Sequence, residues 1–168
     1  RAVRGRMARV DRGQPFPLIV AYAHTPASLA TVLDDLAGLV GPGGGRIAVF
    51  GSAGERDVAK RALQGRVAGE RCRLVIATDE DPRGEDPMAI LEQIAQGAEA
   101  AGLRRGDDLQ LIPDRRAAIA AAIARALPGD VVLLAGKGHE RSILYAHSEV
   151  PWDERRVAEE CLAAAGYG

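Results

Sequence analysis

Polar and charged residues follow four short apolar runs of this sequence directly, and ligand chemistry is expected there. These polar segments are residues 24–26, 51–57, 78–86 and 136–141. In open α/β sheets, ligands bind outside the carboxyl ends of the strands. We therefore expect the four segments to meet at one edge of a sheet and to form a binding site.

The side chains in these segments suit an amino acid as the ligand. Arg56, Arg83 and Glu140 each follow a different apolar run. An arginine fork binds a carboxylate through two hydrogen bonds, and a carboxylate pairs with an ammonium group. The alternatives are a solvated loop for the acidic run 79–86, arginines paired with its acids, and a capping or packing role for His24.

Two glycine-containing segments are weaker candidates for chemistry. The Gly-Lys-Gly turn at 136–138 lets the Lys137 backbone approach a neighbour closely, but it is too short for a phosphate-binding P-loop. The GPGGG segment at 41–45 comes after a predicted helix, whereas phosphate sites precede one. We therefore interpret 41–45 as a plain connection.

The elements that position these residues alternate between strand and helix patterns, which is typical of βαβ units. We predict strands at 17–22, 46–50, 73–77, 109–112 and 130–135, with a weaker edge strand at 6–10. We predict helices at 27–39, 57–70, 87–101, 114–126 and 153–165. The fold class is therefore α/β: a Rossmann-like, doubly wound, mainly parallel sheet of about six strands flanked by helices.

Composition excludes several classes of protein. The chain has 168 residues, 47% hydrophobic and 27% charged, which fits a single domain. A formal net charge of −1 provides no basic surface for nucleic acid or an anionic membrane, and no apolar run approaches membrane-spanning length. The two cysteines lack the spacing of a metal site, so we expect no metal site and a cytoplasmic protein. Because the chain begins at Arg1, a piece of a longer protein is one interpretation.

Six sequence blocks in order resemble the Mur ligase family. Within it, they are most similar to the C-terminal domain of the MurE type, which adds the third residue to UDP-N-acetylmuramoyl-L-alanyl-D-glutamate. The blocks are GRM at 5–7, YAHTP at 22–26, FGSAGERD at 50–57, DEDPRGEDP at 79–87, PDRRAAI at 113–119 and AGKGHE at 135–140. The resemblance covers almost the whole chain.

This resemblance implies an ATP-dependent ligase with Mg²⁺, in which the dipeptide carboxylate is activated as an acyl phosphate and attacked by the amine of an amino acid. It implies that residues 1–168 form one domain, with the UDP-sugar domain and the central ATPase domain outside this chain. The central domain would be its partner, and the substrates would be the UDP-muramoyl-dipeptide and a diamino acid. The isolated domain is expected to be inactive.

Carried over position by position, the family pattern also implies roles for individual residues. Arg6 and His24 would lie on the ATP side. The amino-acid pocket would be lined by Arg56, Asp81, Arg83, Gly136 and Glu140. Arg83 would meet the distal group of the incoming residue.

Three departures from the family pattern leave alternatives open. Ala21 stands where an aspartate is expected to hold the ATP ribose, which should weaken nucleotide binding. Asp81 replaces an asparagine of diaminopimelate-adding members, so L-lysine and L-ornithine are as credible as meso-diaminopimelate. Ser52 and Ala53 replace the usual Cys and Gly. The alternative function is a stand-alone amino-acid or nucleotide binding module; a folylpolyglutamate or cyanophycin type of ligase fits the DPR and GKGHE blocks less well.

Overall fold

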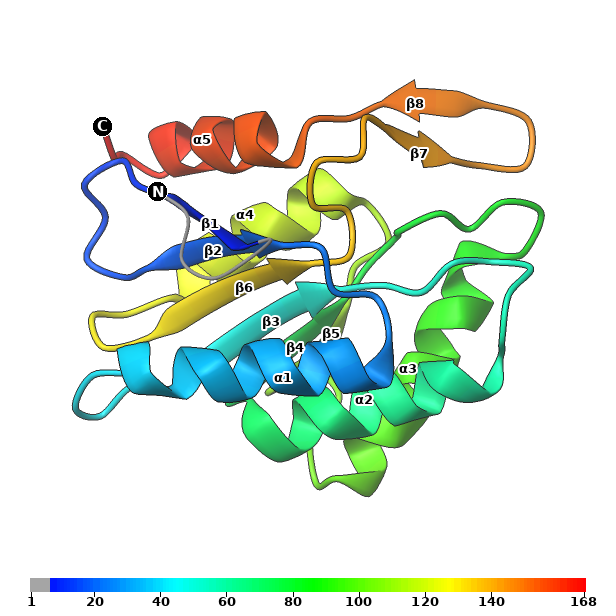
Figure 1. Cartoon of the computed structure of the whole chain (residues 1–168), viewed down its shortest axis with the longest axis horizontal. Helices are drawn as coiled ribbons and strands as arrows, with labels where there is room; N and C mark the ends of the chain where they lie inside the picture. Colours follow the sequence, from blue (N-terminus) through cyan, green and yellow to red (C-terminus); the bar gives the residue numbers. More distant parts are fainter. Residues whose placement is uncertain (1–6) are drawn as a thin grey trace.

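A six-stranded sheet forms the centre of the molecule in the computed structural model, which describes residues 7–168 (Figure 1). The strands run over β1 (Met7–Val10), β2 (Leu18–Ala21), β3 (Arg46–Phe50), β4 (Leu74–Ala77), β5 (Leu109–Leu111) and β6 (Val131–Ala135). Their order in the sheet is β1-β2-β6-β3-β4-β5. All neighbours are parallel except β1, which pairs antiparallel with β2 at one edge.

In the described part of the chain, residues 7–168, five α-helices connect and cover the strands. They are α1 (Pro26–Leu36), which continues as a short 3₁₀ helix η1 (Ala37–Leu39), α2 (Ala59–Arg71), α3 (Pro87–Ala100), α4 (Arg115–Arg125) and α5 (Glu154–Ala164). The side chains of Thr25, Asp86 and Asp114 accept backbone N–H groups at the starts of α1, α3 and α4. These caps lie where the sequence places polar residues beside proline, because the first turn of a helix leaves its N–H groups without internal partners.

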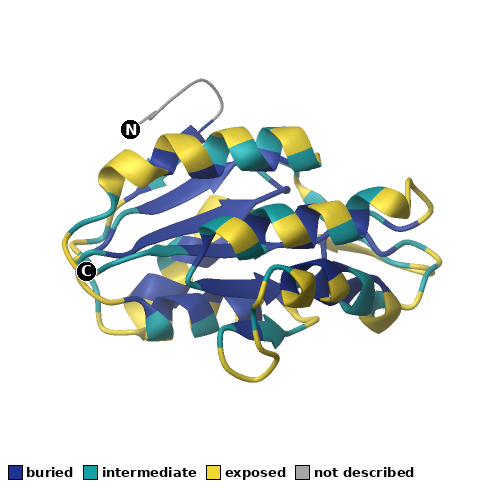
Figure 2. Ribbon diagram, turned by 90° about the horizontal axis from the view of Figure 1, so that it is seen from below, coloured by how far each residue is buried: buried dark blue, intermediate teal, exposed yellow. Residues whose placement is uncertain are grey.

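The sheet is buried on both faces, which explains why its strands are continuous apolar runs. One core contains Leu29, Leu33 and Ile94 from the helices α1 and α3, packed against alternate residues of the strands. The other core contains Ile119, Ile123 and Leu162 from α4 and α5, packed against the remaining strand residues. Figure 2 shows the dark blue strands between helices whose outer sides are exposed. The doubly wound arrangement is therefore confirmed.

The predicted strands and helices are all present, with ends that coincide or differ by at most three residues. The weak edge strand is β1, although Arg6, the first residue predicted for it, lies outside the described residues. The sequence analysis missed a second sheet, a hairpin of β7 (Ser142–Leu144) and β8 (Glu149–Pro151). β7 and β8 have three residues each, and no glycine lies in the turn between them, so this stretch lacks the sequence pattern of a hairpin.

The structure tests one expectation about location, namely whether a helix could span a membrane. Among residues 7–168, no helix is both long and apolar enough to cross a bilayer. The cytoplasmic location stays a prediction.

Candidate functional site

The strand order brings the polar segments together at one edge of the sheet. The four strands that precede them are neighbours in the order β2-β6-β3-β4. Side chains tie the segments to one another: the Ser52 hydroxyl hydrogen-bonds to Gln64, whose Nε2 donates to the backbone oxygen of His24 at 3.0 Å. The expected convergence of these segments at the carboxyl edge is therefore present.

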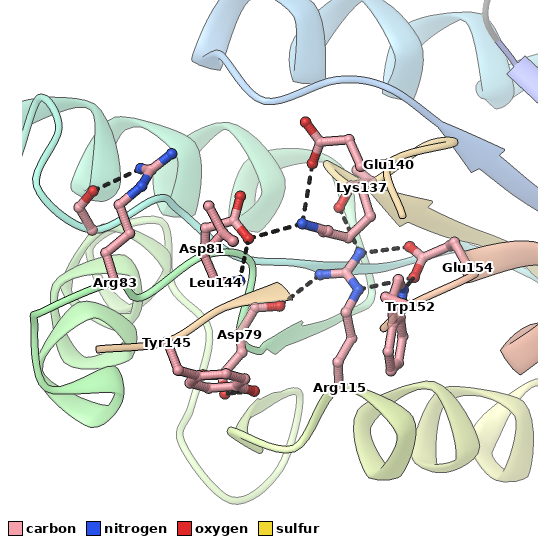
Figure 3. Close-up of polar contacts among 12 residues, drawn as sticks. Asp79, Asp81, Arg83, Arg115, Lys137, Glu140, Leu144, Tyr145, Trp152 and Glu154 are labelled. Atoms are coloured by element: carbon pink, nitrogen blue, oxygen red, sulfur yellow. Dashed lines mark hydrogen bonds and ion pairs between the residues drawn. The ribbon is translucent and has the colours of Figure 1, made fainter. Parts of the chain in front are cut away.

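A buried lysine joins two of the residues predicted to bind the amino acid. The ammonium Nζ of Lys137 lies 2.9 Å from Oδ1 of Asp81 and 3.1 Å from Oε1 of Glu140 (Figure 3). The Lys137 side chain is fully buried, whereas that of Glu140 is 41% exposed. Such a cation fixes both carboxylates and leaves part of Glu140 accessible to a ligand.

Within residues 7–168, the predicted arginines form no hydrogen bond or ion pair with this cluster and bind backbone oxygens instead. Arg83 directs Nη1 to the backbone oxygen of Gly54 at 2.9 Å, and Arg56 directs Nη1 to the backbone oxygen of Glu55 at 3.1 Å. Among residues 7–168, neither guanidinium forms an ion pair with a carboxylate. The alternative that these arginines pair with acids of the 79–86 run is therefore wrong. Their remaining N–H groups suit a ligand carboxylate.

The beginning of the acidic run is buried, which corrects the alternative of a solvated loop. Asp79, Glu80 and Asp81 are only 5%, 7% and 8% exposed. Gly136 has a φ of 111°, and a Cβ atom at this position would collide with Oε1 of Glu80. The positive φ therefore favours glycine at position 136, and the absence of a Cβ atom lets the end of the Glu80 side chain lie against it.

A buried ion pair, Arg115 with Glu154, stabilises the strand ends next to the site. Arg115 binds both carboxylate oxygens of Glu154, through Nε at 3.0 Å and Nη2 at 2.6 Å. Its other N–H groups donate to the backbone oxygens of Asp79 at 2.8 Å and Ala135 at 3.0 Å. Because these two residues lie at the ends of β4 and β6, Arg115 holds together the strand ends from which the site segments begin (Figure 3).

Of the two residues expected on the ATP side, the structure describes His24 but not Arg6. His24 is half-buried, with its ring packed edge-on against Tyr22 at a centroid distance of 4.7 Å, whereas Arg6 lies outside the described residues. Thr25, and not His24, caps α1. Within residues 7–168, no group of three or more His, Cys, Asp or Glu is arranged to hold a metal ion.

Ala21 lies in a place where a carboxylate would be unusual. Its methyl group is 1% exposed and belongs to the same core as Met7 and Leu29. An ionised side chain in such a place is unfavourable unless a partner is provided. The effect of this position on ATP binding stays a prediction.

A groove of about 890 Å³ lies beside the predicted amino-acid site and not within it. Its walls include Val20 of β2, Glu140, and Trp152 and Val157 near the start of α5. Of the residues predicted to bind the amino acid, only Glu140 lines this groove. Glu140 is therefore the residue that the groove and the predicted amino-acid site share.

Burial of Glu80 predicts an unusual dependence of stability on pH. Burial raises the pKa of this carboxyl to about 7, against the opposing charges of Arg115 and Lys137, and its Oε1 has no hydrogen-bond partner among the described residues. Because the folded state binds the proton more tightly than the unfolded state, this group lowers stability as pH rises from about 4.5 to 7. Its contribution is roughly 3 kcal/mol.

We expect Glu80→Gln to remove this part of the pH dependence and to make the protein more stable than the wild type at pH 8. Urea unfolding at pH 5 and pH 8 measures the difference. The exposed Glu149 provides a matched control, since Glu149→Gln should leave the pH dependence unchanged. Equal pH dependence in Glu80→Gln and the wild type would contradict the assignment.

The sequence does not predict the contacts of three residues near these segments. Lys137 stands out in the sequence for its compact ammonium in a Gly-Lys-Gly turn, but no pattern gives it a partner, and none assigns a contact to Arg115 or Tyr145. The Tyr145 hydroxyl donates to Oδ2 of Asp79 at 2.9 Å. A signal for Lys137 was present, because it is one of only two lysines, Lys60 being the other. No local pattern marks Tyr145.

Comparison with known proteins identifies the family. The family described as "Mur ligase, glutamate ligase domain" matches residues 5–138. A UDP-N-acetylmuramyl-tripeptide synthetase of Roseiflexus sp. (strain RS-1) is 57% identical over 99% of this chain and 32% of its own length. A UDP-N-acetylmuramoyl-L-alanyl-D-glutamate--2,6-diaminopimelate ligase of Solibacter usitatus is 44% identical, over 99% of this chain and 33% of its own length.

A solved structure agrees with these sequence relatives. That structure, of a UDP-N-acetylmuramoyl-L-alanyl-D-glutamate--2,6-diaminopimelate ligase, has a TM-score of 0.85 and 34% identity, and the match covers 99% of this chain and 33% of the other. The chain thus spans about a third of the length of the relatives it matches. From its sequence and its fold, the chain belongs to the Mur ligase family, through the glutamate ligase domain.

Proposed function

We propose that this chain is the C-terminal domain of an ATP-dependent ligase that adds a diamino acid to UDP-N-acetylmuramoyl-L-alanyl-D-glutamate. The observation that carries the proposal is the placement of unpaired guanidinium groups and a partly exposed carboxylate at one edge of the sheet. The 57% sequence identity to a UDP-N-acetylmuramyl-tripeptide synthetase supports it. Because this relative is about three times as long, we further propose that the UDP-sugar domain and the central ATPase domain lie outside residues 1–168.

In this proposal the domain binds and orients the incoming amino acid. Arg83 and Arg56 bind a carboxylate of the amino acid, and Glu140 accepts hydrogen bonds from an ammonium group. Lys137 holds Glu140 and Asp81 in place, since its Nζ lies 3.1 Å and 2.9 Å from them. Gly136 lets the backbone approach Glu80 closely. A precisely held amine is what makes attack on an activated carboxylate fast.

ATP would supply the phosphoryl group that activates the dipeptide carboxylate. In this chain His24, and by family pattern Arg6, would contact the nucleotide. Most contacts to phosphates and to Mg²⁺ would come from the central domain, because no phosphate-binding loop is found in this sequence. The isolated chain is therefore proposed to be inactive.

The partner of Asp81 bears on the choice of amino acid. Its Oδ1 accepts from Lys137 Nζ and from the backbone N–H of Leu144, both at 2.9 Å. The charge that distinguishes aspartate from asparagine is thus balanced inside the protein. This leaves meso-diaminopimelate, L-lysine and L-ornithine as candidate substrates, and in the first of them a distal carboxylate would meet Arg83.

The test is ligation by the full-length protein that contains this chain. Purified protein is incubated with UDP-N-acetylmuramoyl-L-alanyl-D-glutamate, ATP, Mg²⁺ and each of the three diamino acids, and product mass and ADP release are measured. We expect one of the three to give tripeptide, and the isolated 168-residue chain to give none. Absence of tripeptide with all three, together with amino-acid binding by the isolated chain, would instead favour a binding module.

A further inference from the structure

The β7–β8 hairpin is attached to the loop that carries Asp81 and Arg83. The hairpin forms its own two-stranded sheet and has no ladder with the central sheet. It lies at the end of the molecule where β3 and β6 finish (Figure 1). Its first strand ends at Leu144, and Tyr145 follows in the turn, where its N–H donates to the backbone oxygen of Ser148 at 2.8 Å.

Three hydrogen bonds join this end of β7 to residues 79–83. The Leu144 N–H donates to Asp81 Oδ1 at 2.9 Å. The Arg83 N–H donates to the Leu144 backbone oxygen at 2.9 Å, and the Tyr145 hydroxyl donates to Asp79 Oδ2 at 2.9 Å. Figure 3 shows Tyr145 and Leu144 beside Asp79 and Asp81. The loop is therefore held at both ends by two consecutive residues of the hairpin.

These hydrogen bonds stabilise the loop at Arg83, where the backbone is strained. Arg83 has a φ of 54°, in the left-handed region that side chains other than glycine rarely adopt. Strain of this kind persists only where surrounding contacts hold it. The hydrogen bond from the Arg83 N–H to Leu144 is one such contact, and it fixes the direction in which the Arg83 side chain leaves the loop.

Tyr145 is the side chain on which this attachment depends. Asp79 is 5% exposed, and its Oδ1 has no hydrogen-bond partner among the described residues. Arg115 Nη1 donates to the Asp79 C=O, and the Asp79 N–H donates to the backbone oxygen of Pro113, so both contacts are made with the Asp79 backbone. The Tyr145 hydroxyl is thus the hydrogen-bond donor to the Asp79 carboxylate within residues 7–168. Removing it leaves a buried carboxylate without a donor, which is unfavourable and displaces the side chain.

We propose that Tyr145 is a positioning residue for amino-acid binding: it locks the β7–β8 hairpin onto residues 79–83 and thereby aims the Arg83 guanidinium at the substrate carboxylate. This inference rests on the proposed function of the site. It predicts that the hairpin acts on the affinity for the amino acid, while the nucleotide side at His24 is unaffected. It also predicts that the hydroxyl, and not the ring, is the active part of Tyr145.

The experiment compares Tyr145→Phe with the wild type in the full-length protein. The phenyl ring is kept and only the hydroxyl is lost. We expect the KM for the diamino acid to rise about tenfold, because one hydrogen bond to a buried carboxylate is removed. We expect kcat and the KM for ATP to change less than twofold. The control is His147→Ala, at the exposed tip of the same hairpin, which should leave all three constants unchanged.

Two outcomes overturn the inference when the wild type is active. One is an unchanged KM for the diamino acid in Tyr145→Phe. The other is an equal change in the constants for both substrates, which indicates a purely structural role.

Amide hydrogen exchange at Arg83 separates this inference from the proposed function. We expect exchange of the Arg83 N–H to be faster in Tyr145→Phe than in the wild type, whatever reaction the protein catalyses. If the wild type forms no tripeptide, the proposed function fails, and the exchange rate alone decides about the hairpin. Equal protection of the Arg83 N–H in Tyr145→Phe and the wild type then contradicts the proposed role of Tyr145.

Discussion

In the full-length protein, if it performs the proposed ligation, replacing Arg83 by alanine is expected to raise the KM for the incoming amino acid by a factor of roughly 30 to several thousand. This range corresponds to the about 2–5 kcal/mol lost when one partner of a buried charge pair is removed. Within residues 7–168 the Arg83 guanidinium binds only the backbone oxygen of Gly54, so it has N–H groups to offer a substrate carboxylate. The KM for ATP should change little, because His24 lies on another strand end.

Arg83→Lys is the matched control for this prediction. It keeps the positive charge and the left-handed backbone demand, but it lacks the planar fork that binds both carboxylate oxygens. We therefore expect a KM between those of the wild type and Arg83→Ala. Steady-state kinetics with each substrate varied in turn measures both constants. Equal weakening of amino acid and ATP in Arg83→Ala would count against the assigned role.

Glu154→Gln is expected to lower the free energy of unfolding of this chain by about 3–5 kcal/mol. Both side chains of the Arg115–Glu154 pair are fully buried, and the closest approach is 2.6 Å. Removing the charge of Glu154 takes from the buried Arg115 guanidinium the carboxylate that it binds directly, which is the costly way to break such a pair. The Trp152 indole, which donates to Glu154 Oε1 at 2.8 Å, also loses a charged acceptor.

Urea unfolding of the purified chain measures this loss, and an exposed pair offers the comparison. Glu92 and Arg105 are 2.7 Å apart, but their side chains are 46% and 39% exposed. Glu92→Gln should therefore change stability by less than about 1 kcal/mol. A double substitution, Arg115→Met with Glu154→Leu, should recover much of the stability lost in Glu154→Gln, since no unpaired charge remains. A loss below about 1 kcal/mol in Glu154→Gln would show that the buried pair is not a major source of stability.

The sequence by itself determined most of the architecture. Apolar runs of four to six residues alternating with amphipathic stretches predict strands buried on both faces, and these strands are β2 to β6. Capping residues are local signals, so Thr25, Asp86 and Asp114 could be read directly as helix starts. The edge of the sheet that carries the polar segments also followed, because parallel strands place all their carboxyl ends on one side.

The tertiary structure decided which of those polar residues meet. Lys137 and Asp81 are 56 residues apart in the sequence and become partners only because β6 and β4 flank β3 in the sheet. The local sequence around Lys137 or Asp81 does not predict this strand order. The sequence therefore indicates Glu140 from its residue type and position, and Asp81 from the family resemblance, as ligand-binding candidates, but neither reveals the cation between them.

Burial of charge was likewise decided by the fold alone. The run that begins at Asp79 has the composition of a solvated loop, yet its first three residues are buried beneath the hairpin and beside Arg115. Burying a carboxylate is unfavourable unless distant groups provide donors or opposite charge. Those groups, Tyr145 for Asp79 and Lys137 for Asp81, come from the far end of the chain. Periodicity and capping depend on neighbours in sequence, whereas the compensation of buried charge depends on neighbours in space.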